Sequence, residues 1–147
     1  MKELLNVWSR YCLNRNLGLV LIRVAVGMVF FAHGWGKVNN LPMVEGMFTG
    51  FGLGAGTGVF IAYLEVIGGL AMILGIFTRV FGVILGIEML AAVFLTGFSK
   101  GLYKPHELEL VLMLLSFGIA LTGSGKHSIY AAECDDCGGI VCDIHKK

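Results

Sequence analysis

The sequence predicts an all-α fold: an integral membrane four-helix bundle, with a short interfacial helix before it and a Cys-rich tail after it. Composition supports this prediction in two ways. Of the 147 residues, 56% are hydrophobic and only 14% are charged, whereas about a quarter of the residues of an average soluble domain are charged. A soluble domain of this length has too little interior to bury so much apolar surface. The 22 glycines favour close packing between membrane helices.

Four apolar blocks, separated by short polar segments, are the expected membrane spans. They run from about Leu17 to Trp35, from Gly56 to Phe77, from Val80 to Phe98 and from Leu108 to Thr122. Each block is long enough, or nearly so, to cross about 30 Å of hydrocarbon as a helix. We therefore expect one membrane domain over residues 17–130.

The connecting segments indicate where the helices begin and end. A glycine-rich external loop from Val38 to Ala55 separates the first two blocks, and we expect one interfacial turn within it, at Met43 to Phe51. A tight turn around Thr78 and Arg79 joins the second block to the third. Pro105 suits the first turn of the fourth helix, because its φ is already helical and it needs no amide donor there.

The ends of the chain differ from the membrane domain in composition. Residues 1–16 place apolar side chains at helical intervals opposite basic ones, which is typical of a segment that lies along the membrane surface. Residues 131–147 form a polar tail that is rich in Cys and Asp. The 11 basic and 10 acidic residues of the whole chain nearly cancel, so net charge gives no reason to expect a nucleic-acid partner.

The distribution of Lys and Arg predicts a multi-pass protein of the cytoplasmic membrane with both termini in the cytoplasm, because basic residues gather on the cytoplasmic side. In that orientation the outside holds Lys37, Lys100 and Lys104, and the inside holds Lys2, Arg10, Arg15, Arg79, Lys126, Lys146 and Lys147. The tail would then lie in a reducing compartment.

Ionisable residues within or beside the apolar blocks are the candidate site. A charged side chain at a helix centre costs about 2.5 to 3.5 kcal/mol on insertion scales, so it needs a partner or a task. Arg23, His33 and Lys37 share one face of the first block. In an antiparallel bundle, Glu65 and Glu107 would meet His33 and Lys37 toward the outer side, while Arg23 would lie toward the inner side. Such a group could bind a quinone and exchange protons with it, since imidazole titrates near neutral pH.

Other interpretations of the same charges remain open. The residues of the candidate site could instead form buried ion pairs that only set the register of the bundle. Glu88 lies near the middle of the third block, and the sequence shows no evident partner for it.

The tail carries a candidate metal site. Cys134 and Cys137 form a C-x2-C pair, and Cys142 and His145 form a C-x2-H pair. Paired short spacings of this kind let four side chains converge on a tetrahedral zinc ion. Two alternatives are a redox-active dithiol in Cys134 and Cys137 and a disordered tail without a site.

Several motifs together resemble the DoxX family of small four-helix membrane proteins. They are Arg23, the His33-Gly34-x-x-Lys37 element, Leu64-Glu65-Val66-Ile67-Gly68-Gly69-Leu70, Leu74-Gly75-Ile76-Phe77-Thr78-Arg79 and Gly123-x-Gly125-Lys126-His127-Ser128. The resemblance runs from Leu17 to about Tyr130. It implies a four-span bundle in a prokaryotic cytoplasmic membrane, related to subunits of thiosulfate:quinone oxidoreductase and to membrane-tethered redox defence.

By this resemblance, Arg23, His33, Lys37, Glu65 and Arg79 match the family pattern, and Glu107 or Glu109 matches an acidic residue before the fourth span. The Cys-rich tail departs from the usual family end. Our main hypothesis is a quinone-interacting subunit of a sulfur or thiol oxidoreductase system, with another oxidoreductase subunit or a second copy of the chain as partner. The alternatives are a small transporter or permeability factor with a metal-sensing tail, and a membrane scaffold or assembly protein.

Overall fold

A computed structural model describes residues 15–97 and 107–125, and all the regular secondary structure in these ranges is helical. The interfacial segment expected before residue 15 and the Cys-rich tail lie outside the described residues. The helices are α2 (Arg15–Val38), α3 (Leu41–Gly50), α4 (Thr57–Leu74), α5 (Thr78–Gly97) and α6 (Glu107–Thr122).

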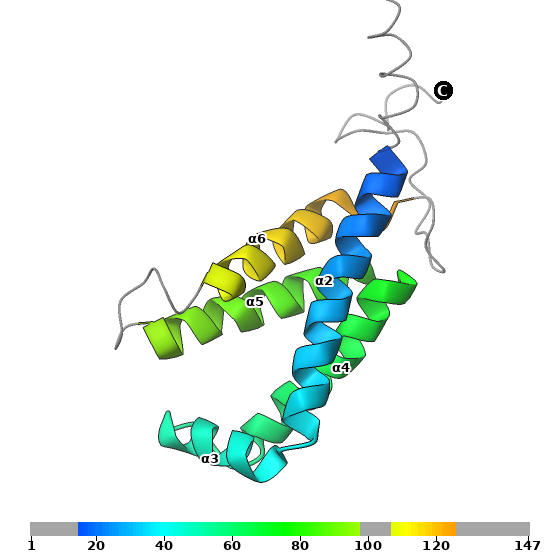
Figure 1. The fold of residues 1–147 in the computed structure, drawn as a ribbon. Coiled ribbons are helices and arrows are strands. Elements are labelled where there is room, and N and C mark those ends of the chain that lie inside the picture. The colour runs from blue at the N-terminus through cyan, green and yellow to red at the C-terminus, as the bar shows by residue number, and fades with distance from the viewer. Residues whose placement is uncertain (1–14, 98–106, 126–147) are drawn as a thin grey trace, which may run out of the picture.

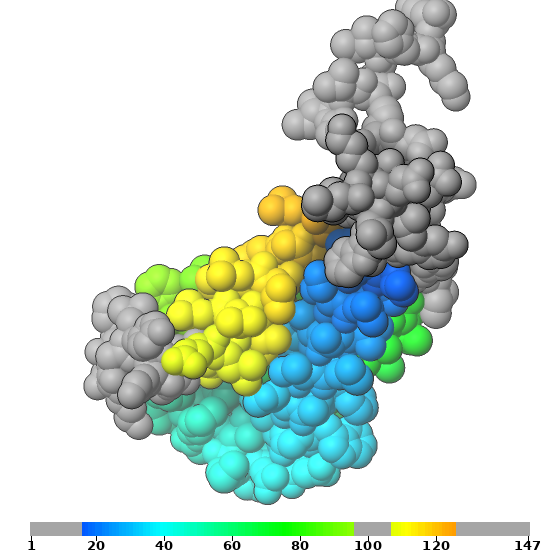
Figure 2. Space-filling model, turned by 45° about the horizontal axis from the view of Figure 1, so that its top comes forward, coloured from blue at the N-terminus to red at the C-terminus, as the bar shows by residue number. Residues whose placement is uncertain are grey.

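The four long helices are arranged as two pairs (Figure 1). Helix α2 packs along α4, and α5 packs along α6, and these are the two most extensive helix contacts. The pairs cross each other steeply and meet where α4 contacts α5 and α2 contacts α6. Figure 2 shows α6 and α2 side by side on one face of the molecule. The short helix α3 contacts α2 and α4 at one end of their pair.

Three of these helices, α2, α4 and α5, are long and apolar enough to cross a membrane. Their outward faces carry large apolar side chains, such as those of Ile67 and Ile87, which are more than half exposed. Such a surface is unfavourable in water and suits contact with lipid. Helix α6 has 16 residues, fewer than the roughly 20 that cross the hydrocarbon core, so a fourth crossing stays a prediction.

Glycines bring the paired helices close together. On α2 and α4, a Cβ atom placed on Gly69 would lie 2.6 Å from the Phe31 nitrogen and 2.7 Å from the Gly27 oxygen. On α5 and α6, a Cβ atom on Gly82 would lie 2.8 Å from the Ser116 oxygen. Only glycine permits such close approach at these positions. Large side chains then fill the centre of the bundle, among them those of Phe30, Met72 and Leu85.

Two connections differ from the sequence expectation. The segment expected to hold one interfacial turn forms the ten-residue helix α3, because Pro42 suits its first turn. The tight turn between α4 and α5 begins at Gly75, whose φ of 77° ends α4, and Thr78 is already helical. Glycine adopts this left-handed conformation without a steric penalty.

The start of α2 and the end of α6 lie at the same end of the molecule. A Cβ atom on Gly125 would be 3.7 Å from the Asn16 oxygen. Arg23 is only 3% exposed and donates a hydrogen bond of 3.0 Å from Nη1 to the Ser124 carbonyl oxygen. This buried arginine therefore joins α2 to the residues that follow α6.

Replacing Gly27 by Ala should destabilise the protein. The added Cβ would lie 2.7 Å from the Gly69 oxygen, so α2 and α4 would have to separate, at a cost of about 1 to 3 kcal/mol. Thermal unfolding in one detergent, followed by circular dichroism, measures the effect. Gly18→Ala, on the same helix, is the matched control, because its added Cβ would meet no described atom within 4 Å. Equal melting of the two variants would contradict the close approach.

Candidate functional site

The centre of the candidate site is an ion pair between α2 and α4. The Lys37 Nζ lies 2.6 Å from the Glu65 Oε1. The Glu65 side chain is only 2% exposed, whereas that of Lys37 is 25% exposed. The pair therefore links the interior of the bundle to a more open surface.

A close helix approach positions this pair. A Cβ atom on Gly34 would lie 2.8 Å from the Glu65 Cβ and 2.7 Å from the Val66 nitrogen, so α2 and α4 nearly touch at this level. Lys37 follows Gly34 by about one turn on the same face of α2. Its long side chain can then reach the carboxyl group of Glu65 across the narrow interface.

Helix α5 adds a second carboxyl group, that of Glu88. A Cβ atom on Gly68 would lie 3.1 Å from the side chain of Leu85, which places these two residues opposite each other on α4 and α5. Glu65 precedes Gly68 by about one turn on α4, and Glu88 follows Leu85 by about one turn on α5, so both carboxyl groups lie near this contact. The Glu88 carboxyl is electrostatically coupled to the Glu65 carboxyl and to Lys37.

The three side chains of Lys37, Glu65 and Glu88 form one cluster, which we call the charge cluster. Glu88 is 9% exposed. Neither of its carboxyl oxygens, nor Oε2 of Glu65, has a hydrogen-bond partner among the described residues. Buried acceptors of this kind are costly unless a donor or a proton reaches them. The charge cluster therefore has unused capacity to bind hydrogen-bond donors or protons.

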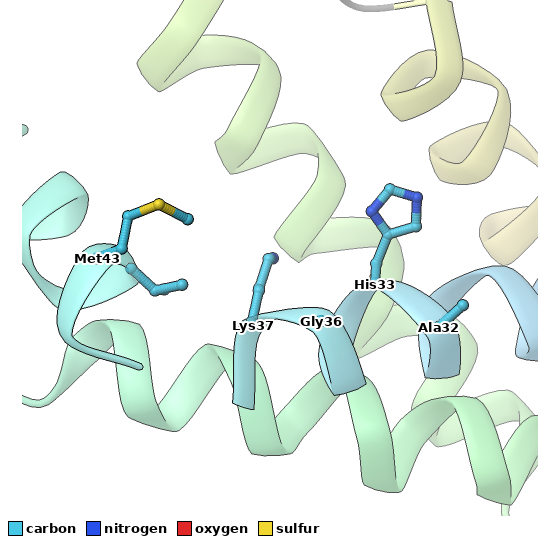
Figure 3. Close-up of a pocket in the computed structure, with 6 residues that line it drawn as sticks. Ala32, His33, Gly36, Lys37 and Met43 are labelled. Carbon is cyan, nitrogen blue, oxygen red and sulfur yellow. The ribbon is translucent and has the colours of Figure 1, made fainter. Parts of the chain in front are cut away.

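A shallow pocket lies beside the charge cluster, between α2 and α3 (Figure 3). Its volume is about 330 Å³, and its lining consists of Ala32, His33, Gly36, Lys37, Met43 and Val44. His33 and Lys37 extend from α2 to the same side, and Met43 faces them from α3. Lys37 thus belongs both to the pocket and to the charge cluster.

The structure brings together part of the site that the sequence predicted. Lys37 contacts Glu65, and His33 shares the pocket with Lys37. Glu107 is exposed at the first residue of α6 and is not among the pocket residues. Arg23 lies at the opposite end of the bundle, where it binds the Ser124 carbonyl.

Sequence reasoning missed the partner of Glu88, although a signal for it was present. Glu65 precedes Ile76 by eleven residues, and Glu88 follows Phe77 by eleven. Equal distances from a tight turn make two such residues candidates for contact. The contribution of α3 was also missed. Its Val44 lines the pocket, and its Glu45 accepts a hydrogen bond from the Gly56 amide, which holds α3 to the start of α4.

The expected zinc site cannot be located in the structure. Cys134, Cys137, Cys142 and His145 all lie outside the described residues. Within the two described ranges, no group of three or more His, Cys, Asp or Glu side chains is placed to hold a metal ion.

The fold and site define a helical membrane protein with a buried charge cluster next to an open pocket. Comparison with known proteins agrees with this class. The family model described as DoxX matches residues 18–97. "Putative oxidoreductase CatD" of Bacillus subtilis (strain 168) is 32% identical over 108 residues, which are 74% of this chain and 81% of that protein. No solved structure matches the chain. The chain belongs to the DoxX family, as the motifs in its sequence indicated.

Replacing Lys37 by Met should destabilise the protein more than replacing both Lys37 and Glu65. The single change leaves Glu65 buried without its ammonium partner, and breaking a buried pair in this way costs about 3 to 5 kcal/mol. The double variant Lys37→Met/Glu65→Gln removes both charges and should recover much of that loss. Denaturant unfolding in detergent micelles measures the wild-type protein, the single variants Lys37→Met and Glu65→Gln, and the double variant. A double variant that loses as much as the sum of both single variants would show that the pair is not coupled.

Proposed function

We propose that this protein is a quinone-interacting membrane subunit of a sulfur or thiol oxidoreductase system. One observation carries the proposal: the charge cluster opens, through Lys37, into a largely apolar pocket whose lining includes His33. Ligand sites commonly combine an apolar lining with a few placed polar groups. The printed name of the Bacillus relative, an oxidoreductase, supports the same class of chemistry.

The residues of the pocket fit a quinone. Its ring is flat and apolar, and its two carbonyl oxygens accept hydrogen bonds. Met43 and Val44 from α3 and Ala32 from α2 offer apolar contact to the ring. The Lys37 ammonium and the His33 imidazole are both able to donate to a carbonyl oxygen. A cation so placed stabilises negative charge on an oxygen, especially where water is scarce.

Each polar residue then has a distinct task. A bound quinone supplies the two-electron chemistry, taking up two protons, and the electrons come from the thiol or sulfur compound that a partner subunit oxidises. Lys37 binds and orients the carbonyl, and Glu65 holds the Lys37 side chain in place. His33 is exposed, so its imidazole can exchange protons with water. The proposal rests on these three residues, since Arg23 and Glu107 lie outside the pocket.

We also propose that α6 is a fourth span and that both termini are cytoplasmic. The start of α2 and the end of α6 lie at one end of the molecule, as an even number of crossings requires. Arg23 and Arg79 both lie beside residues 123 and 124 at this end. Basic residues mark the cytoplasmic side, and labelling from each side of the membrane would distinguish the two orientations.

Purified protein in lipid nanodiscs should bind a short-chain ubiquinone saturably, as measured by quenching of tryptophan fluorescence. Lys37→Met should weaken binding about 10- to 100-fold, because a hydrogen bond to a charged group contributes about 1.5 to 3 kcal/mol. His33→Ala should weaken it in the same direction.

Arg79→Met is the matched control for this experiment. It also removes a basic side chain, but that side chain lies beside Gly123 at the end of the bundle away from the pocket, so quinone affinity should stay unchanged. Failure of the wild-type protein to bind quinone would refute the proposal. Solute flux in proteoliposomes without quinone binding would favour a transporter. Absence of both flux and quinone binding would favour a scaffold.

We further propose that the tail binds zinc through Cys134, Cys137, Cys142 and His145. Ligand type and spacing support this proposal, because thiolate and imidazole are the ligands that zinc prefers. Purified wild-type protein should contain about one zinc ion per chain for such a four-ligand site, and Cys134→Ala should contain much less. Elemental analysis measures both, and equal metal content in the two proteins would argue against the site.

A further inference from the structure

Glu88 is a buried ionisable group that the proposed function does not use. It lies in the middle of α5, at 9% exposure, and both of its carboxyl oxygens lack a hydrogen-bond partner among the described residues. An ionised acid in the middle of a membrane helix costs free energy unless a cation, a hydrogen-bond donor or a proton compensates its charge.

The neighbouring helices define the electrostatic surroundings of Glu88. Helix α4 presents Glu65, and α2 presents Lys37 at the far side of Glu65. From α6, the apolar Leu112 packs into the same core as Leu85 and Met89, the neighbours of Glu88 on α5. The acid of α6 nearest in level is Glu109, whose Oε2 is likewise buried without a partner. Within residues 15–97 and 107–125, the cation Lys37 therefore faces more than one carboxyl group.

Charge balance within the cluster then leads to a definite protonation state. With both Glu65 and Glu88 ionised, one ammonium would leave a net negative charge in an apolar interior. The Oε2 of Glu65 and both oxygens of Glu88 would also remain acceptors without a donor. One proton removes the excess charge and joins the Glu65 Oε2 to one oxygen of Glu88, as in other sites where two carboxyl groups face each other.

We propose that Glu65 and Glu88 share one buried proton, which makes them a proton-holding dyad beside the pocket. Glu65 accepts from Lys37 through Oε1 and from the shared proton through Oε2. The charge cluster is then neutral, with one ammonium, one carboxylate and one carboxylic acid. Such a proton belongs to the pair rather than to either residue.

The dyad has a use in the proposed reaction. With a quinone in the pocket, the dyad supplies one of the two protons that accompany its two-electron reduction to the quinol. Water supplies the other proton by way of His33, and a proton from water later restores the dyad. The electrons come from the thiol or sulfur compound that the partner subunit oxidises. This use rests on the proposed function, whereas the shared proton itself does not.

Infrared spectroscopy of the full-length protein in lipid at neutral pH tests the dyad without any quinone. A protonated carboxylic acid gives a carbonyl stretch that carboxylates lack, and this band shifts in heavy water. We expect the band in the wild-type protein and its loss in Glu88→Gln, since Glu65 would then be an ionised partner of Lys37. Lys37→Met should keep the band and raise its area up to about twofold, because two acids without a cation are neutral only when both are protonated.

Two controls make the result decisive. Glu107→Gln removes an exposed carboxyl group and should leave the band unchanged. Circular dichroism and size-exclusion profiles identify variants that are folded, and Glu65→Gln provides a second test of band loss if Glu88→Gln does not fold. A wild-type spectrum without the band overturns the proposal, and so does a band that persists in both folded Gln variants. A bound monovalent cation in place of the proton would also give a wild-type spectrum without the band.

The catalytic use of the dyad has a separate test. If the wild-type protein binds ubiquinone, Glu88→Gln should bind it with unchanged affinity and lower the rate of its reduction in the assembled system by about tenfold or more, the usual scale of a proton-transfer group. An unchanged rate would overturn the catalytic use, even with the infrared band present. Absence of quinone binding would instead refute the proposed function. The infrared band would then be the test of the dyad.

Discussion

The ion pair between Lys37 and Glu65 is the interaction on which the rest of the site depends. It places a cation at the edge of the pocket while its carboxylate stays in the interior, at 2% exposure. Because charges are costly in hydrocarbon, the pair constrains both helices at once. Lys37 must turn toward α4, and Glu65 must face α2 on one side and α5 on the other. The charge cluster, the pocket and the proposed dyad all follow from this placement.

Close helix packing makes this interaction available. Gly34 lets α2 approach the backbone of α4 next to Glu65, and Gly68 lets α4 meet Leu85 of α5 one turn from Glu88. Larger residues at these two positions would hold the helices apart, and the charged side chains would have to reach across the gap. The glycines thus serve the electrostatics of the site as well as the packing of the bundle.

The charges of the described residues are also separated along the bundle. Arg23 and Arg79 lie where α2 begins and α6 ends, beside residues 123 and 124. The charge cluster lies away from them, toward α3, with Lys37 as its cation. The basic end and the charge cluster therefore lie at different levels of the bundle.

The sequence by itself determined the membrane class, the four long helices and the family. Apolar blocks and glycine content can be recognised in the sequence without knowledge of contacts. Lys37 and Glu65 could be paired from their expected depth in the membrane alone. Only the tertiary structure decided that Glu88 joins them, that α3 walls the pocket, and that Glu107 and Arg23 lie elsewhere. Helix periodicity gives the face of a residue but not the rotation and crossing of one helix against another. Those depend on how glycines and large side chains of different helices fit together, which is a property of the packed bundle.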